Sequence, residues 1–136
     1  MNNQQIETLI RSISTSVEGR SGHWQFTVKE VRIICLTDEL HNRMRFIAPI
    51  AQADKLSEEH ITRSMEANFH TALDARYAIS DGVLWSCFIH PLKELAEDQA
   101  LDALKQVYSC AKTFGTTYSG GSLSFLTNED RQARKN

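Results

Sequence analysis

Three cysteines are the side chains of this chain best suited to nucleophilic or redox chemistry. Cys35, Cys87 and Cys110 are odd in number and widely spaced, a pattern typical of reduced thiols rather than of a disulfide framework. Cys35 and Cys87 fall at apolar positions of predicted strands, where a free cysteine behaves as a small hydrophobic residue. Cys110 shares its predicted helical face with no cation that would lower its pKa. The cysteines therefore predict core positions rather than a catalytic nucleophile.

The five histidines lack the spacing of a metal site. His60 and His70 fall on one predicted helix, but ten residues, or about 15 Å, separate them, which is too far to share an ion. No histidine has a Cys, Asp or Glu partner in a known ligand pattern. The glycine-containing segments 19–22 and 120–122 are not phosphate loops, since neither continues into Lys-Ser or Lys-Thr at a helix start. We expect no metal, no cofactor and no catalytic residue, and hence a protein that is not an enzyme.

Three further polar residues are predicted to serve the fold. Asn68 falls near the end of the middle helix, where it can hydrogen-bond the chain entering the next strand. Arg76 can pair with a carboxylate on a neighbouring element. Asp81 is a turn residue, since its side chain can bond the backbone two positions on.

The composition indicates one ordinary globular domain. The chain has 136 residues, 41% of them hydrophobic, and a formal net charge of −2. This length supports a core without disulfides or a structural metal, so we expect one domain over residues 1–126 and a polar tail over residues 127–136. The start of the chain does not resemble a signal peptide, and we expect a cytoplasmic protein with no membrane contact. The near-neutral charge gives nucleic acid no attraction to the molecule as a whole.

The first half of the chain predicts one helix and a three-stranded meander. Apolar residues from Ile6 to Val17 recur at steps of three and four, as on one face of a helix. From residue 24 to 49 the period changes to two, as in strands with one buried face. A turn at 29–30 places Trp24 opposite Cys35. A second turn centred on 39–40 places Cys35 opposite Met44, and in both pairings apolar residues meet.

The second half predicts a middle helix, a hairpin and a last helix. Ser57 has the position of an N-cap, and the helix that follows carries a narrow apolar stripe at Ile61, Met65 and Phe69. Residues 76–79 and 83–89 form the hairpin, with Ser80-Asp81-Gly82 as a three-residue loop. The last helix covers residues 97–118. The prediction is therefore an α+β fold, a five-stranded antiparallel sheet in the order α-βββ-α-ββ-α.

The outward side of this sheet is unusually apolar, which indicates that another surface covers it. The residues predicted there, and hence the predicted partner-binding residues, are Arg32, Ile34, Leu36, Arg43, Arg45, Ile47, Leu84 and Phe88. The middle helix, a second copy of the chain or a client protein could cover them. The stripe Ile61, Met65 and Phe69 is the predicted interface of a homodimer with two-fold symmetry.

Several segments resemble those of a known family. They are the meander, Met65-Glu66-Ala67-Asn68, the run from Ala75 to Gly82, His90-Pro91-Leu92 and the long last helix. Over about residues 23–118 the chain resembles the YbjN-type bacterial proteins, putative sensory-transduction regulators with a type III secretion chaperone-like fold. The resemblance implies that fold and a tendency to work by binding protein. It implies no catalytic residues.

The function that these features favour is protein binding. We expect a non-enzymatic module of chaperone, adaptor or regulatory type that acts through the Arg-lined apolar sheet face or the middle helix. One alternative is a type III secretion chaperone for a specific effector. The other is a nucleic-acid-associated regulator, suggested by Arg32, Arg43, Arg45 and Arg76, although few aromatic residues accompany these arginines.

Overall fold

The structure is a computed structural model that describes residues 1–14 and 16–121. The chain has an α+β fold. The predicted tail, residues 127–136, lies outside the described residues. The elements in chain order are α1 (Asn3–Ile13), β1 (Val17–Arg20), β2 (His23–Val28), β3 (Val31–Asp38), β4 (Arg43–Gln52), α2 (Glu58–His70), β5 (Arg76–Ser80), β6 (Val83–His90) and α3 (Glu97–Thr113), with a short 3-10 turn at Ala53–Lys55. The predicted fold class is confirmed, but the antiparallel sheet has six strands rather than five, in the order β1-β2-β3-β4-β6-β5.

Strand β1 replaces the end of the predicted first helix. Helix α1 stops at Ile13, and Val17 instead lies opposite Phe26 of β2. The two strands approach closely at Gly19, where an added Cβ would lie 2.1 Å from the carbonyl oxygen of His23. Val17 continues the helical spacing of the apolar residues by coincidence. The spacing of apolar residues within one segment does not indicate whether that segment pairs with a neighbouring strand, and here the pairing with β2 makes it a strand.

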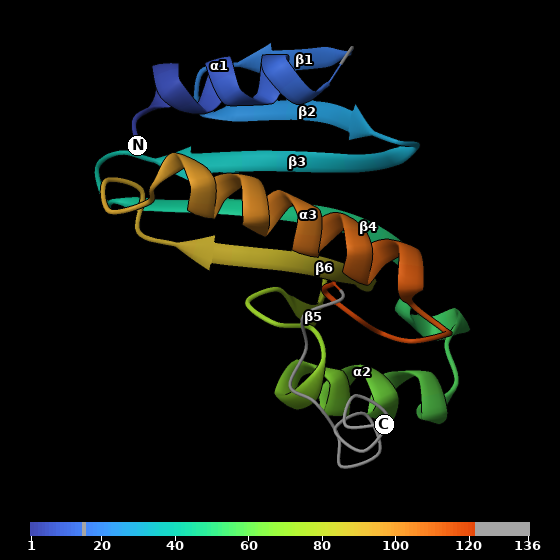
Figure 1. Cartoon of the computed structure of the whole chain (residues 1–136). Coiled ribbons are helices and arrows are strands. Elements are labelled where there is room, and N and C mark those ends of the chain that lie inside the picture. The colour runs from blue at the N-terminus through green and yellow to red at the C-terminus, as the bar shows by residue number, and fades with distance from the viewer. Residues whose placement is uncertain (15, 122–136) are drawn as a thin grey trace.

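Helices α1 and α3 lie on the same face of the sheet, α1 along β1 and β2 and α3 across β3, β4 and β6 (Figure 1). The core lies between these helices and the strands, and its largest fully buried side chains include Trp24, Phe26, Ile33, Phe46, Ile6, Ile10, Leu84 and Val107. Helix α3 ends at Thr113 rather than at the predicted residue 118, because Phe114 has a non-helical ψ of 132° and Gly115 a positive φ of 87°. No helix in the described ranges is long and apolar enough to cross a membrane.

Helix α2 lies beside β5 at one end of the sheet rather than over a sheet face (Figure 1). Ser57 caps it, as predicted, by accepting a 3.2 Å hydrogen bond from the His60 backbone N–H. Asn68 fastens the helix to the sheet: its amide nitrogen donates to the Tyr77 carbonyl oxygen at 3.0 Å and its carbonyl oxygen accepts from the Tyr77 N–H at 2.7 Å. The predicted hydrogen-bonding role of Asn68 at the entry to the hairpin is therefore confirmed.

The meander has the predicted faces, but one register differs. Between β2 and β3, Trp24 lies opposite Cys35 and Val28 opposite Val31, as predicted. Between β3 and β4, Cys35 lies opposite Phe46 rather than Met44. The difference arises because the connection is a four-residue loop, residues 39–42, and not a two-residue turn. A shift of two residues leaves each side chain on its predicted face, since side chains alternate with a period of two.

In the β5–β6 hairpin the structure differs from the prediction in which side of β6 faces the core. Its loop has two residues, Asp81 and Gly82, with φ values of 51° and 74°, as in a type I′ turn, so Ser80 pairs with Val83. The predicted three-residue loop paired Ile79 with Val83 instead. A one-residue shift reverses the faces of a strand. Leu84, Ser86 and Phe88 of β6 consequently point into the core.

Candidate protein-binding surface

The face of the sheet opposite α1 and α3, here called the outer face, has an apolar centre. Three adjacent strands contribute apolar neighbours there: Ile34 of β3 lies opposite Ile47 of β4, which lies opposite Cys87 of β6. The apolar centre consists of Ile34, Leu36, Ile47, Trp85, Cys87 and Ile89. Ile89 is 53% exposed, Cys87 is buried and the other four are half-buried. The expectation that apolar side chains remain on both faces of the sheet is therefore met.

Two predicted members of this surface were wrong. Leu84 is 1% exposed and Phe88 is 5% exposed, and both lie in the core under the helices. Because the hairpin turn has two residues rather than three, Trp85 and Ile89 lie on the outer face in their place, although they were predicted to point inward. The indole N–H of Trp85 donates a 3.2 Å hydrogen bond to the Ser80 carbonyl oxygen, which holds the ring over the hairpin. An Asp-Gly pair is itself the signal for a two-residue turn that the sequence contained.

Arginines surround and interrupt the apolar centre. Arg32, Arg43 and Arg45 are exposed on the outer face, as predicted, and Arg45 lies between Leu36 and Ile89 in adjacent strands. The Arg32 guanidinium hydrogen-bonds the Gln25 side chain. Alternating guanidinium and apolar groups of this kind can stack on a polypeptide and hydrogen-bond it at the same time.

Arg76 reaches the outer face from β5, opposite Cys87. The predicted carboxylate partner of Arg76 is not what the side chain contacts. Its guanidinium instead donates to the backbone carbonyl oxygens of Leu73 and Ala75, the latter at 2.8 Å. These bonds orient Arg76 on the chain that enters β5.

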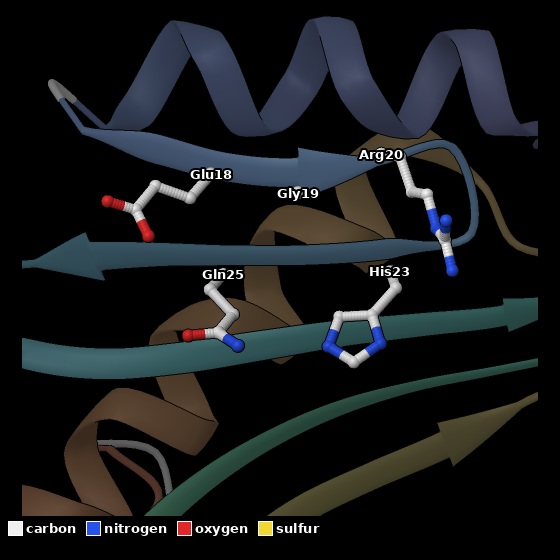
Figure 2. A pocket seen from close by; sticks show the side chains of 5 residues that line it. All are labelled: Glu18, Gly19, Arg20, His23 and Gln25. Carbon is white, nitrogen blue, oxygen red and sulfur yellow. The ribbon is translucent and has the colours of Figure 1, made fainter.

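A shallow polar concavity of about 420 Å³ extends the outer face over β1 and β2. Figure 2 shows its lining residues Glu18, Arg20, His23 and Gln25 projecting from the strands on the side away from the helices, with Gly19 between them. Arg20 and His23 are cross-strand neighbours, and His23 lies opposite Leu36 of the apolar centre. The concavity is therefore continuous with the apolar centre. The sequence analysis missed it, because it ended the first helix with Val17 and predicted no strand at residues 17–20.

The α2 stripe, Ile61, Met65 and Phe69, is separate from the outer face. Met65 is 51% exposed and Phe69 81% exposed, whereas Ile61 is half-buried. The buried residues of α2 are instead Ser64 and Ala67. Helix α2 lies beside β5 and does not cover the outer face, which was one of the three expected possibilities. Two of its three stripe residues, Met65 and Phe69, are themselves exposed.

A second apolar concavity, of about 410 Å³, lies on the helix side of the sheet. It is bordered by Ile13, Val28, Leu101, Leu104 and Tyr108, with Lys29 and Lys105 at its margin. The sequence reasoning assigned these residues to the interior and did not identify a groove. This concavity lies where α1 ends at Ile13, between the tip of the β2–β3 hairpin and α3.

The thiols show no sign of activation. Burial raises the pKa of Cys35, and it raises the pKa of Cys110 to about 12. Burial also raises the pKa of Cys87, although Arg45 and Arg76 act in the opposite direction. Cys87 lies on the outer face rather than the inner one, because the β6 faces are reversed. Within residues 1–14 and 16–121 no three His, Cys, Asp or Glu side chains form a group that could hold a metal ion.

The fold is that of type III secretion chaperones. Three solved structures match. The HopA1–SchA chaperone–effector complex is 10% identical, with a TM-score of 0.61 over 82% of this chain and 94% of that chain. The ExsC–ExsE complex is 15% identical, with a TM-score of 0.60 over 82% of this chain and 92% of that chain, and the Yersinia pestis type III secretion chaperone SycH in complex with a stable fragment of YscM2 is 12% identical, with a TM-score of 0.61 over 83% of this chain and 98% of that chain.

Neither a protein-family model nor a curated protein sequence matches this chain. The resemblance to the YbjN-type proteins therefore stays a prediction, while the chaperone-like fold that it implied is confirmed.

Proposed function

We propose that this chain is a non-enzymatic protein-binding module of chaperone or adaptor type, and that the apolar centre of the outer face is where it holds its client. The observation that carries the proposal is the solvent exposure of the apolar centre in the described part of the chain. Ile89 is 53% exposed, and Ile34, Leu36, Ile47 and Trp85 also retain solvent contact. A contiguous apolar surface bordered by arginines is typical of protein interfaces.

The structural neighbours support this proposal. All three are described as complexes of two proteins, one of them a chaperone–effector complex and another a chaperone bound to a protein fragment. A more specific version, in which the chain is a type III secretion chaperone for one effector, has the same surface and differs only in the client.

A homodimer through the α2 stripe is the second part of the proposal. Met65 and Phe69 expose large apolar side chains on α2, whereas the residues that α2 buries within the chain are the small Ser64 and Ala67. Two copies of such a stripe can bury each other around a two-fold axis, and this arrangement would leave the outer face of each copy free for a client.

The experiment compares two substitutions of equal chemistry on opposite faces. Ile89→Asp places a charge in the apolar centre, and Ile79→Asp places the same charge on the other face of the adjacent strand. The two positions are matched, with exposures of 53% and 51%. We expect both variants to fold, as judged by circular dichroism, because neither side chain is in the core.

Tagged wild-type protein and both variants are then used to capture partners from lysate of the source cells, with quantitative mass spectrometry. We expect one set of proteins to be retained by the wild type and by Ile79→Asp but reduced at least about tenfold by Ile89→Asp, since a charge in the centre of an interface remains unpaired after desolvation. Equal recovery by all three proteins would contradict the proposed surface.

A further inference from the structure

The charges of the described residues are divided between the two sides of the sheet. The outer face carries five arginines, Arg20, Arg32, Arg43, Arg45 and Arg76, against two carboxylates, Glu18 and Asp38. The three helices show the opposite balance, with seven carboxylates, Glu7, Glu58, Glu59, Glu66, Glu97, Asp98 and Asp102, against Arg11, Arg63, Lys105 and Lys112. A chain with a net charge of −2 thus has a locally positive sheet face.

The outer-face arginines are not neutralised within the described part of the chain. The ion pairs among residues 1–14 and 16–121 are Arg11 with Glu7 and His41 with Asp38, and neither involves an outer-face arginine. The His41 backbone N–H donates to one Asp38 carboxylate oxygen at 3.0 Å, and the His41 ring nitrogen Nδ1 lies 2.8 Å from the other. These two contacts lower the pKa of the Asp38 carboxyl, and both of its oxygens already have a partner. Cations that lie next to apolar groups and lack carboxylate partners favour a ligand that supplies carboxylates.

Resting on the proposed function, we propose that the partner of the outer face is an extended polypeptide segment whose sheet-facing residues, which are every second residue of the segment, are alternately apolar and acidic. Arg45 lies between Leu36 and Ile89, so a strand-like segment crossing there meets an apolar group, a cation and an apolar group in succession. Six strands about 4.8 Å apart span about 24 Å, which an extended segment of about eight residues crosses.

The same features favour a polypeptide over a nucleic acid. Arg43 and Arg45 are neighbours on β4, but Ile34 and Leu36 separate them from Arg32, and Cys87 and Ile47 lie beside Arg76, so the cations of the outer face form no continuous band. Glu18 would also face the phosphates of any nucleic-acid strand that followed β1 and β2. Trp85 is the one aromatic residue of the apolar centre, so successive bases would find no series of stacking partners.

The test uses three labelled peptides of about twelve residues. All three have Ser at every second position. The remaining positions, which share one side of an extended segment, are alternately Leu and a test residue, and the test residue is Glu, Ser or Lys. A single-stranded oligonucleotide is the fourth probe. Binding is measured by fluorescence anisotropy at about 0.01 M and about 0.15 M salt, where the Debye length is about 30 Å and about 8 Å. We expect the Glu peptide to bind at least about fivefold more tightly than the Ser peptide at low salt, and this ratio to shrink at high salt.

The variant for this test is Arg32→Gln/Arg45→Gln, and the matched control is Lys55→Gln/Lys112→Gln, which removes two exposed cations that lie outside the sheet. All four positions are exposed, so the folds are expected to persist. The arginine variant should weaken binding of the Glu peptide about three- to tenfold and leave the Ser peptide unchanged, whereas the control should change neither.

Each other outcome overturns the inference in a different way. Equal binding of all three peptides, with loss of binding in Ile89→Asp, would refute an acidic partner and leave the proposed function standing. Preference for the Lys peptide would reverse the assigned charge. Tight, steeply salt-dependent binding of the oligonucleotide would replace the polypeptide by a nucleic acid. If none of the probes binds, the inference is refuted. The proposed function is refuted as well only if wild type and Ile89→Asp capture the same proteins equally in the lysate experiment.

Discussion

Replacing Asn68 by alanine should loosen α2 from the sheet without disturbing the core. The Asn68 amide makes two hydrogen bonds to the backbone of Tyr77, at 3.0 Å and 2.7 Å, and so takes the place that a neighbouring strand would occupy beside β5. Alanine leaves the N–H and carbonyl of Tyr77, a residue that is 2% exposed, without these partners. Each lost bond costs about 1 kcal/mol, and incomplete access of water to the backbone adds to this.

The expected loss is therefore about 2–3 kcal/mol of unfolding free energy, a substantial part of the roughly 5–15 kcal/mol typical of a small domain. Urea denaturation followed by circular dichroism measures it, with Gln4→Ala as the control. Gln4 is exposed on α1, and we expect that variant to stay within about 0.5 kcal/mol of the wild type. Hydrogen exchange at the Tyr77 amide provides a local readout, which should accelerate in Asn68→Ala.

A loss below about 0.5 kcal/mol with an unchanged exchange rate at Tyr77 would refute the reasoning. It would mean that water replaces the amide at no cost and that α2 is held against β5 mainly by Ser64 and Ala67.

Two further predictions concern self-association and the thiols. Light scattering should show a dimer for the wild type and a monomer for Phe69→Asp. The control Leu40→Asp, which changes an 88% exposed loop residue, should remain dimeric. A monomeric wild type would contradict the proposed dimer. Cys35, Cys87 and Cys110 should react slowly with a thiol reagent near pH 8 in the native state and rapidly in denaturant, since burial raises the pKa of all three, and rapid native labelling would contradict their placement.

Sequence periodicity was sufficient where each strand or helix has one buried side. The alternation of Trp24 and Phe26 with polar neighbours placed β2 correctly, and Ser57 marked the start of α2. The β3–β4 register was wrong by two residues, yet Ile34, Leu36 and Ile47 remained on the outer face because a shift of two preserves the faces.

Periodicity failed in β6, where both faces are apolar. Leu84 and Phe88 alternate with Trp85, Cys87 and Ile89, so either set could occupy the core. The choice depended on one residue of loop length at Asp81 and Gly82, and the predicted loop was one residue too long. The same limit applies to β1, where Val17 fitted a helical stripe and its pairing with β2 decided otherwise.

The amino-acid sequence alone determined the α+β class, the apolar character of the outer sheet face and the exposed positions of Arg32, Arg43 and Arg45, because composition and a period of two are local properties of the chain. Only the tertiary structure decided which side of β6 joins that face, where α2 lies and how the charges are divided between the two sides of the sheet. These depend on turn geometry and on contacts between segments far apart in the chain, and a local pattern carries no information about either.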